Sequence, residues 1–492
     1  MSQTQSSPLL DRSTGKALNN YISGNWRAAG TTATEPVYNP ATGEEIARVP
    51  LSGSADVDAA VQAACVAFPA WRDTPVPERV QVLFRFKQLL EQNFETLARQ
   101  VVTENGKTIE DARGEVRRGI EVVDFACGMP TLIQGETVGQ ISRGTDSFTV
   151  RVPLGVVGGI CPFNFPAMIP LWMFPIAIGA GNTFVLKPSE RTPISGALLA
   201  ELFSQAGLPA GVLNVVHGAR EAVDALLQHS EVRAISFVGS APVARYVYER
   251  AATAGKRVQA LAGAKNHLLV MPDADLDLAV KAVLSSAFGA AGQRCLAGSV
   301  VVAVGEIGDT LVDRLRESAG NLRIGSGLQE DTAMGPLVRR DACTRVRNYV
   351  EKGIQEGARL VLDGRESPAG QGFFLRPTIF DHVHPDMAIA RDEIFGPLLS
   401  VVRARDIEEA IAIANRSPFG NAASIFTRNG AAARLFRTRI EAGMVGINVG
   451  VAAPMAFFPF AGWKGSFFGD LHATGKDAVR FYTETRVVIE RW

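Results

Sequence analysis

The sequence has no net charge and little cysteine. Lys and Arg together number 50, and so do Asp and Glu, so no charged face for nucleic acid is predicted. The five cysteines are odd in number and scattered over 492 residues, which argues against a disulfide framework and favours reduced thiols in the cytoplasm. The first twenty residues are polar and lack the apolar core of a secretory signal, so we expect a mobile tail there.

Long apolar runs and metal-binding patterns are also missing. The most apolar stretch, residues 166–180, is shorter than the roughly 20 residues that a membrane-spanning helix needs, and it is interrupted by prolines. We therefore predict a buried core segment and no membrane partner. The six histidines form no HExxH pattern and no ligand set with the cysteines, so no metal site is predicted. No G-x-S-x-G or Walker motif points to a serine hydrolase or a P-loop enzyme either.

What is present is an alternation of short apolar runs and helix-like stretches. A chain of this length exceeds one hydrophobic core, so two large domains are expected. Helical periodicity covers residues 56–72 and 77–104, and β-branched runs without polar alternation recur between residues 155 and 305. This pattern predicts an α/β fold with a doubly wound parallel sheet that is covered on both faces. A second alternation follows, from about residue 298 to residue 448.

Two further segments have the pattern of strands with one exposed face. Residues 138–153 alternate apolar and polar side chains, and so does the C-terminal segment 481–492. We predict one strand in each segment. Such strands can pair with each other or with another subunit, which makes a homo-oligomer, a dimer or a tetramer, the expected assembly.

The G-x-G-x-x-G fingerprint of dinucleotide-binding sheets is absent. Gly179-Ala180-Gly181 comes closest, but it precedes a strand and is predicted to end a helix. Gly239-Ser240 is better placed, because an apolar strand ends there and a helix begins, so that backbone N–H groups face a ligand phosphate. Lys187 and Glu190 follow another strand. Glu190 can accept hydrogen bonds from a ribose and repel a 2′-phosphate, which favours NAD over NADP, although a solvated turn explains the two charges equally well.

Two polar side chains are candidates for chemistry. Cys295 lies in the glycine-rich segment FGAAGQRCLAG, where backbone N–H groups can stabilise a thiolate. Its flanks alone favour a buried structural thiol. Asn164, in CPFNFP, lies at the end of a predicted strand, and its amide is a suitable donor for an oxyanion. A turn-capping role is equally compatible with this position.

Together these elements resemble the aldehyde dehydrogenase superfamily over essentially the whole chain. The resemblance is carried, in order, by CPFNFP, KPSE, FVGS, GAK, GQRC, EIFGP and GWKGS. It implies that Cys295 is the nucleophile, with Asn164 and the backbone N–H of Cys295 as the oxyanion hole. It further implies cofactor contacts along the NAD molecule, from Phe163, Lys187, Glu190, Gly239, Ser240, Glu393 and Phe395.

One position departs from the hydrolytic members of that superfamily. They carry a glutamate that activates water four residues before the Lys of GAK, and here that position is Leu261. A leucine side chain cannot accept a proton, so the thioester must be released by another route. VQALAGAKNH and FNFPAMIPLWMFP are similar to the CoA-acylating methylmalonate-semialdehyde dehydrogenases. The resemblance implies oxidation of malonate or methylmalonate semialdehyde, loss of the carboxylate, and acyl transfer to coenzyme A, giving acetyl-CoA or propionyl-CoA.

Such a substrate carries a carboxylate that requires a cationic partner, and the family pattern indicates Arg118 and Arg294. The resemblance also divides the chain into an NAD-binding domain (1–132 and 153–262), a catalytic domain (263–447), and an oligomerisation arm with a C-terminal segment (133–152 and 448–492). Two rival functions remain open. One is a hydrolytic NAD-dependent aldehyde dehydrogenase that gives a free acid, and the other is a non-catalytic protein built on the same fold.

Overall fold

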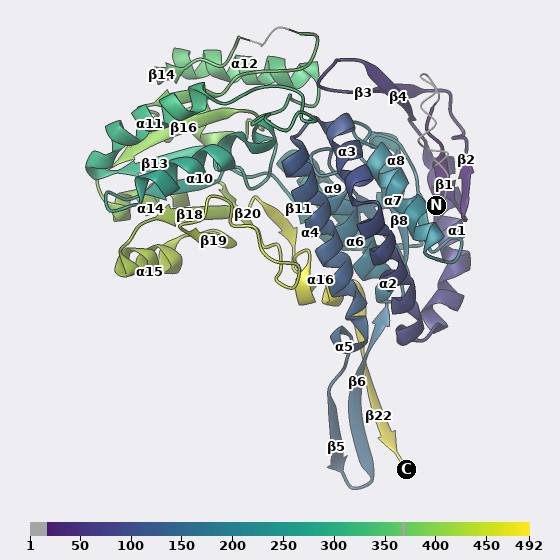
Figure 1. The fold of residues 1–492 in the computed structure, drawn as a ribbon. Coiled ribbons are helices and arrows are strands. Elements are labelled where there is room, and N and C mark those ends of the chain that lie inside the picture. Colours follow the sequence, from purple (N-terminus) through teal and green to yellow (C-terminus); the bar gives the residue numbers. More distant parts are fainter. Residues whose placement is uncertain (1–16, 367–369) are drawn as a thin grey trace.

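The computed structural model describes residues 17–366 and 370–492. The described chain forms two units, each built around its own β-sheet, and a narrow arm that projects away from both (Figure 1). Residues 1–16 of the predicted tail lie outside the described range. The tail prediction is wrong at its end, because Asn20 begins the first strand and is fully buried. No helix in the described ranges is both long and apolar enough to cross a membrane.

The first sheet has eight strands in the spatial order β2-β1-β9-β8-β7-β10-β11-β21. Its five central strands, β9-β8-β7-β10-β11, are parallel to one another, whereas β1, β2 and β21 pair antiparallel. The chain builds outward from β7 to one side and then resumes at β10 on the other, which creates a switch point between β7 and β10. The strands are β1 (Asn20–Ile22), β2 (Asn25–Arg27), β7 (Val156–Ile160), β8 (Thr183–Lys187), β9 (Leu213–Val215), β10 (Val232–Val238), β11 (Arg257–Leu261) and β21 (Phe467–Gly469).

Helices cover both faces of this sheet, as the uninterrupted apolar strands predicted. One face packs against α1 (Ser54–Asp73), α8 (Arg220–Gln228) and α9 (Ala241–Thr253). The other packs against α6 (Met168–Gly179) and α7 (Ile194–Gln205), which are covered in turn by α2 (Val76–Gln92), α3 (Phe94–Asn105) and α4 (Ile109–Cys127). Every residue of α6 is buried, which confirms the prediction of core for this stretch. The short α5 (Met129–Leu132) leads to the arm, and α16 (Gly475–Phe481) contacts α6.

The second sheet has seven strands in the order β14-β15-β16-β13-β12-β18-β19, all parallel to their neighbours except β14. Its strands are β12 (His267–Val270), β13 (Val300–Val304), β14 (Arg359–Leu362), β15 (Thr378–Asp381), β16 (Leu398–Ala404), β18 (Ala422–Phe426) and β19 (Met444–Ile447). Its helices are α10 (Leu276–Phe288), α11 (Gly308–Gly320), α12 (Arg340–Gln355), α13 (Ala388–Arg391), α14 (Ile407–Asn415) and α15 (Gly430–Arg439). The doubly wound α/β fold is thus confirmed.

The arm corrects one prediction. Residues 138–153 do not form one strand but a hairpin of β5 (Thr137–Ser142) and β6 (Thr145–Pro153). The chain reverses at Gly144, whose φ of 70° suits glycine. The C-terminal β22 (Thr483–Arg491) pairs antiparallel with β6 from Thr483↔Pro153 to Arg491↔Thr145, which confirms that the two segments meet. Two smaller pairs join β3 (Thr34–Tyr38) to β4 (Glu45–Pro50) and β17 (Phe419–Gly420) to β20 (Trp463–Lys464).

The predicted domain division stays a proposal. The first sheet ends with β11 at Leu261 and the second begins with β12 at His267, on either side of the predicted boundary at 262/263. The C-terminal segment is shared, since β21 joins the first sheet and β22 joins the arm.

Candidate active site

A cavity of about 830 Å³ opens at the carboxyl ends of β7, β8 and β10, where a doubly wound sheet holds its ligands. The residues predicted for catalysis and for NAD binding all line it, although they come from both halves of the chain. They are Phe163, Asn164, Lys187, Glu190, Gly239, Ser240, Cys295, Glu393 and Phe395.

Asn164 lies in the loop between β7 and α6. Its side chain is buried, and its Nδ2 donates a 2.9 Å hydrogen bond to the carbonyl oxygen of Gln293. An amide nitrogen carries two hydrogens, so one is used here and one remains for a ligand. The carbonyl oxygen of Phe163, the preceding residue, accepts from Asn105 Nδ2 at 3.1 Å and from Thr192 Oγ1 at 3.0 Å.

Cys295 lies in the connection between α10 and β13. Ala290 and Ala291 there have φ of 50° and 54°, a left-handed conformation that costs non-glycine residues energy. At Gly292, with φ of 73°, a Cβ would lie 2.3 Å from the carbonyl oxygen of Gly396, so only glycine fits. The segment that bears Cys295 is therefore packed directly against the segment that bears Glu393 and Phe395.

The backbone of Cys295 is fixed by two asparagines that the sequence analysis did not assign. Asn266 Nδ2 and Asn421 Nδ2 donate to the carbonyl oxygen of Cys295 at 2.8 and 2.9 Å. Asn266 belongs to the GAKNH motif, which offered a signal for its importance. Asn421 precedes β18 and lies 126 residues away in sequence, with no motif to indicate its role.

The Cys295 side chain is half-buried and protonated at neutral pH. Burial raises the pKa of its thiol to about 12, the carboxylate of Glu393 adds to the rise, and backbone N–H groups with Arg294 only partly oppose it. Because the thiolate is the reactive form of a cysteine, this environment disfavours reaction of Cys295.

The far end of the cavity is built from the ends of β8 and β10. Lys187 is buried, and its Nζ lies 3.2 Å from Glu190 Oε2 and donates to the carbonyl oxygen of Gly218 at 2.9 Å. Burial would raise the pKa of Glu190, but the charge and hydrogen bond of Lys187, a backbone N–H and the charge of Arg191 together outweigh burial, and the pKa is lowered. Glu190 is thus an anionic acceptor. Ser240 caps α9 without using its hydroxyl in a capping bond, which leaves a helix N-terminus open to the cavity.

The end nearest Cys295 is closed by Glu393 and Phe395. Glu393 Oε1 accepts a 2.9 Å hydrogen bond from the backbone of Ala264, and burial raises the pKa of this carboxyl to about 7. The ring of Phe395 meets that of Phe163 edge-on, with centroids 5.7 Å apart. A carboxylate acceptor beside aromatic rings suits a ribose joined to a flat heterocycle.

Leu261 ends β11, where it pairs with Val238 of β10 and with Phe467 of β21. Its side chain is buried in the apolar cluster against which Cys295 packs. Among the described residues that line the cavity, only Glu190 and Glu393 carry carboxylates. Position 261, where hydrolytic members of the superfamily carry the water-activating glutamate, therefore has no proton acceptor.

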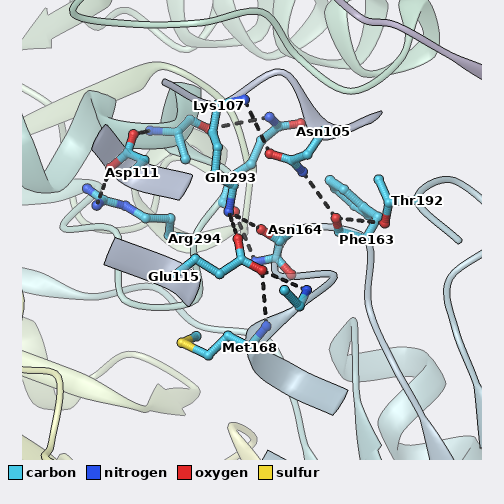
Figure 2. Close-up of polar contacts among 12 residues, drawn as sticks. Asn105, Lys107, Asp111, Glu115, Phe163, Asn164, Met168, Thr192, Gln293 and Arg294 are labelled. Carbon is cyan, nitrogen blue, oxygen red and sulfur yellow. Dashed lines mark hydrogen bonds and ion pairs between the residues drawn. The ribbon is translucent and has the colours of Figure 1, made fainter. Parts of the chain in front are cut away.

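The structure does not bring the two predicted arginines into this cavity. Arg118 donates from Nη1 to the carbonyl oxygen of Pro454 at 3.0 Å and lines a separate small hollow with Trp172 and Phe460. Arg294 donates from Nη2 to the carbonyl oxygens of Ser285 and Ser286, and its Nη1 lies 3.8 Å from Asp111 (Figure 2). Their predicted role in substrate binding stays a prediction.

The sequence and the fold both match known proteins. The chain is 59% identical over 478 residues to malonate-semialdehyde dehydrogenase 2 of Geobacillus thermodenitrificans, covering 97% of this chain and 99% of that protein. A solved methylmalonate-semialdehyde dehydrogenase of Oceanimonas doudoroffii superposes with a TM-score of 0.95 at 48% identity, covering 97% and 98%. A Sinorhizobium meliloti protein solved in complex with NAD superposes with a TM-score of 0.96 at 47% identity, covering 98% and 99%.

A family model carries the match over nearly the full length. The model of the aldehyde dehydrogenase family spans residues 26–488, which includes the cavity, the second sheet, and most of the first sheet and of the arm. The chain belongs to the aldehyde dehydrogenase family.

Proposed function

We propose that this protein oxidises malonate or methylmalonate semialdehyde with NAD, through a thioester on Cys295, and transfers the acyl group to coenzyme A. One observation carries the choice of acceptor: the apolar Leu261 occupies the position of the water-activating carboxylate. The names of the 59% identical relative and of the solved relative at 48% identity support the choice of substrate.

NAD fits the cavity by size and by donor set. A volume of about 830 Å³ is within the range of cofactor clefts, and it runs from the ribose acceptor Glu190 to Glu393. The open N-terminus of α9 at Ser240 suits a pyrophosphate, and the anionic Glu190 disfavours a 2′-phosphate. NAD, when bound, would supply the acceptor for the hydride, with its two electrons, that leaves the substrate carbon. A solved relative binds NAD, which supports this choice.

Acylation is the work of Cys295 and Asn164. Cys295 loses its thiol proton to water, its sulfur bonds to the aldehyde carbon, and the electron pair of the carbonyl bond moves to the oxygen, which becomes an oxyanion. We assign the free hydrogen of Asn164 Nδ2 and the backbone N–H of Cys295 as its donors. Donors fixed before the reaction stabilise the developing charge without reorganisation, and each is worth about 10²–10³ in rate. Oxidation of the thiohemiacetal leaves the thioester on Cys295.

Decarboxylation follows from the substrate and the same donors. The carboxylate is β to the thioester carbonyl, so breaking the bond to it releases CO₂ and moves the electron pair into an enolate oxygen. The oxyanion donors stabilise that enolate, which then takes a proton at carbon to give an acetyl or propionyl thioester. The thiol of coenzyme A attacks this carbonyl, and Cys295 leaves. We retain Arg118 and Arg294 as the cationic groups for the substrate carboxylate.

Assembly and location complete the proposal. The arm exposes large apolar side chains, including Val487 at 62% and Ile489 at 66%, and all six residues of β5 are exposed. Exposed apolar strands favour association, so we propose a homo-oligomer, a dimer or tetramer, formed through the arm. The five cysteines are free thiols, which supports a reducing compartment such as the cytoplasm.

Product analysis tests the function. The enzyme is mixed with NAD and malonate semialdehyde, with and without coenzyme A, and the acyl product is identified by mass. We expect a burst of at most one NADH per active site without coenzyme A, and steady turnover to acetyl-CoA with it. Sustained turnover to free acid without coenzyme A, at a comparable rate, would establish the hydrolytic rival instead.

A further inference from the structure

One face of α4 contacts three separate segments of the active site. Asp111, Glu115 and Arg118 are spaced four and three residues apart and so lie on the same side of the helix. Asp111 Oδ2 accepts from the backbone of Ala290 at 3.0 Å, in the left-handed segment before Cys295. Arg118 reaches Pro454, and Glu115, between them, reaches the loop that carries Asn164 (Figure 2).

Glu115 forms a buried ion pair with Lys107. Lys107 Nζ lies 2.6 Å from Glu115 Oε2, and the side chains are 1% and 0% exposed. The other carboxylate oxygen of Glu115 accepts from the backbone N–H groups of Ala167 and Met168, at 2.8 and 3.1 Å. These two amides begin α6, where unpaired donors need an acceptor. The carboxylate therefore holds the end of the loop that follows Asn164.

Lys107 holds the middle of that loop. Its Nζ donates to the backbone carbonyl oxygen of Asn164 at 2.6 Å and lies 4.1 Å from the centre of the Phe165 ring. Both contacts are stronger for a charged donor than for a neutral one. With the bonds from Asn105 and Thr192 to Phe163, the backbone is fixed on both sides of Asn164 (Figure 2).

We infer that Lys107 and Glu115 are positioning residues for the oxyanion hole, acting through the backbone of Asn164. Once that backbone is fixed, only two side-chain torsions separate the amide from its working position. A displacement of about 1 Å can cost on the order of a hundredfold in rate. A buried ion pair is seldom the most stable way to fill a core, since apolar residues of equal volume often do as well. Placement of Asn164 gives this pair a function that core packing alone does not.

The test removes both charges together, so that neither is left unpaired. The variant Lys107→Met/Glu115→Gln keeps the side-chain volumes, and its matched control is Arg113→Met/Glu95→Gln, which removes an exposed ion pair between α4 and α3. The rate of the NADH burst is measured with malonate semialdehyde, alongside NAD affinity and the melting temperature. We expect a burst rate 10- to 100-fold lower in the first variant, NAD affinity within about twofold, and no change in the control. A wild-type burst rate in the first variant would overturn the inference.

A double-mutant cycle separates positioning from general loosening. If the pair acts through Asn164, adding its substitutions to Asn164→Ala lowers the burst rate by less than about twofold more. A further loss equal to that in the wild-type background overturns the inference. Hydrogen exchange gives a readout independent of turnover: the backbone amides of Phe165, Ala167 and Met168 should exchange faster in the pair variant and at an unchanged rate in the control. If the double variant does not fold, Glu115→Asp, which keeps the charge but withdraws it from the amides, replaces it with the same expected direction.

The inference rests on the proposed function through the substrate used and through the role of Asn164 in the oxyanion hole. Absence of any wild-type NADH burst with malonate semialdehyde would refute that function. The exchange rates of the loop would still decide whether Lys107 and Glu115 hold Asn164.

Discussion

The side-chain amide of Asn164 donates a 2.9 Å hydrogen bond to the carbonyl oxygen of Gln293, two residues before Cys295. This bond joins the loop after β7, in the first sheet, to the loop before β13, in the second. It orients the amide plane and directs the remaining hydrogen. The loop that bears Asn164 and the loop that bears Cys295 would perform acylation together. The Asn164 amide, which would stabilise the oxyanion, therefore also holds these two loops in place relative to each other.

Replacing Asn164 with alanine tests that role. Asn164→Ala removes one oxyanion donor, and we expect the rate of the NADH burst to fall about 10²–10³-fold while NAD affinity stays near wild type. Asn164→Asp is the comparison variant, since it keeps the shape but places an acceptor where a donor is needed, and its loss should be larger. Burst rates in stopped flow measure both. Two variants with wild-type rates would remove Asn164 from the oxyanion hole.

The pKa of Cys295 predicts how its alkylation depends on pH. Burial raises this pKa to about 12, so the thiolate fraction rises about tenfold per pH unit throughout the neutral and moderately alkaline range. Iodoacetamide should inactivate the protein at a rate that climbs from pH 7 to pH 10 without a plateau, when no NAD is added. A plateau below pH 9 would mean that the thiol is activated before any ligand binds. Cys295→Ala serves as the control, because any iodoacetamide that it incorporates has reacted with one of the other four cysteines.

Glu104 predicts a pH dependence of stability. It is fully buried, it accepts from the backbone of Ile194 and Ser195 at 2.8 Å each, and burial raises its pKa to about 7. The folded state therefore keeps a proton that the unfolded chain releases above about pH 4.5. The stabilisation is complete below that pH and is lost as pH rises through 7, by on the order of 3 kcal/mol.

Melting temperatures at pH 5 and pH 8 measure this loss. Glu104→Gln cannot titrate and keeps an acceptor oxygen for one of the two amides, so its melting temperature should change less between these pH values than that of the wild type. Glu306→Gln, which alters an exposed carboxylate, serves as the control and should follow the wild type. Equal pH dependence in all three proteins would exclude Glu104 as the titrating group.

The sequence analysis succeeded where local pattern decides structure. Parallel strands such as β7 and β8 read as unbroken apolar runs because both their faces are covered, and the turn at Gly239 could be placed from the strand before it. The nucleophile was different, because the surroundings of Cys295 alone favoured a structural thiol. Only the ordered set of motifs in the resemblance made it a candidate, and the cavity that gathers those residues agrees with that choice.

Contacts between distant segments could not be predicted from one sequence. Asn421 reaches Cys295 across 126 residues, and Lys107 reaches Asn164 across 57, with no periodicity to connect either pair. Lys107 and Glu115 also look like ordinary exposed charges in a helical pattern, since burial of an ion pair depends on what packs over it. The hairpin turn at Gly144 was missed because β5 and β6 continue the same alternation on both sides of it.

Cofactor choice is predicted to depend on Glu190. Its pKa is lowered because Lys187, a backbone N–H and Arg191 together outweigh the effect of burial, so the side chain is anionic at neutral pH and would repel a 2′-phosphate. Glu190→Gln keeps an acceptor for a ribose hydroxyl but removes the charge. We expect kcat/KM for NADP to rise about tenfold and kcat/KM for NAD to fall by a few-fold. A repulsion of about 1.4 kcal/mol between Glu190 and the 2′-phosphate corresponds to a factor of ten. Steady-state kinetics with both cofactors measure the ratio, and an unchanged ratio would assign the discrimination elsewhere.

The last prediction concerns the position that separates the two deacylation routes. Leu261→Glu places a carboxyl group in the apolar cluster beside Cys295, where burial raises its pKa toward neutrality and makes it a competent base for water. We expect turnover without coenzyme A to rise by about 10²-fold over that of the wild type, as general-base catalysis typically provides. NADH formation beyond the burst, together with free acid as the product, measures the change.

Leu261→Gln is the matched control, because glutamine brings similar size and polarity but cannot take a proton at neutral pH. If both variants gain hydrolysis equally, the rate of thioester hydrolysis in the wild type is limited by the entry of water and not by the absence of a base. If only Leu261→Glu gains hydrolysis, the wild type lacks hydrolysis because leucine cannot accept a proton from water. If neither variant does, while both fold and still form the thioester, then the apolar side chain at 261 does not explain the dependence on coenzyme A, and the acceptor must be selected by a contact elsewhere in the cavity.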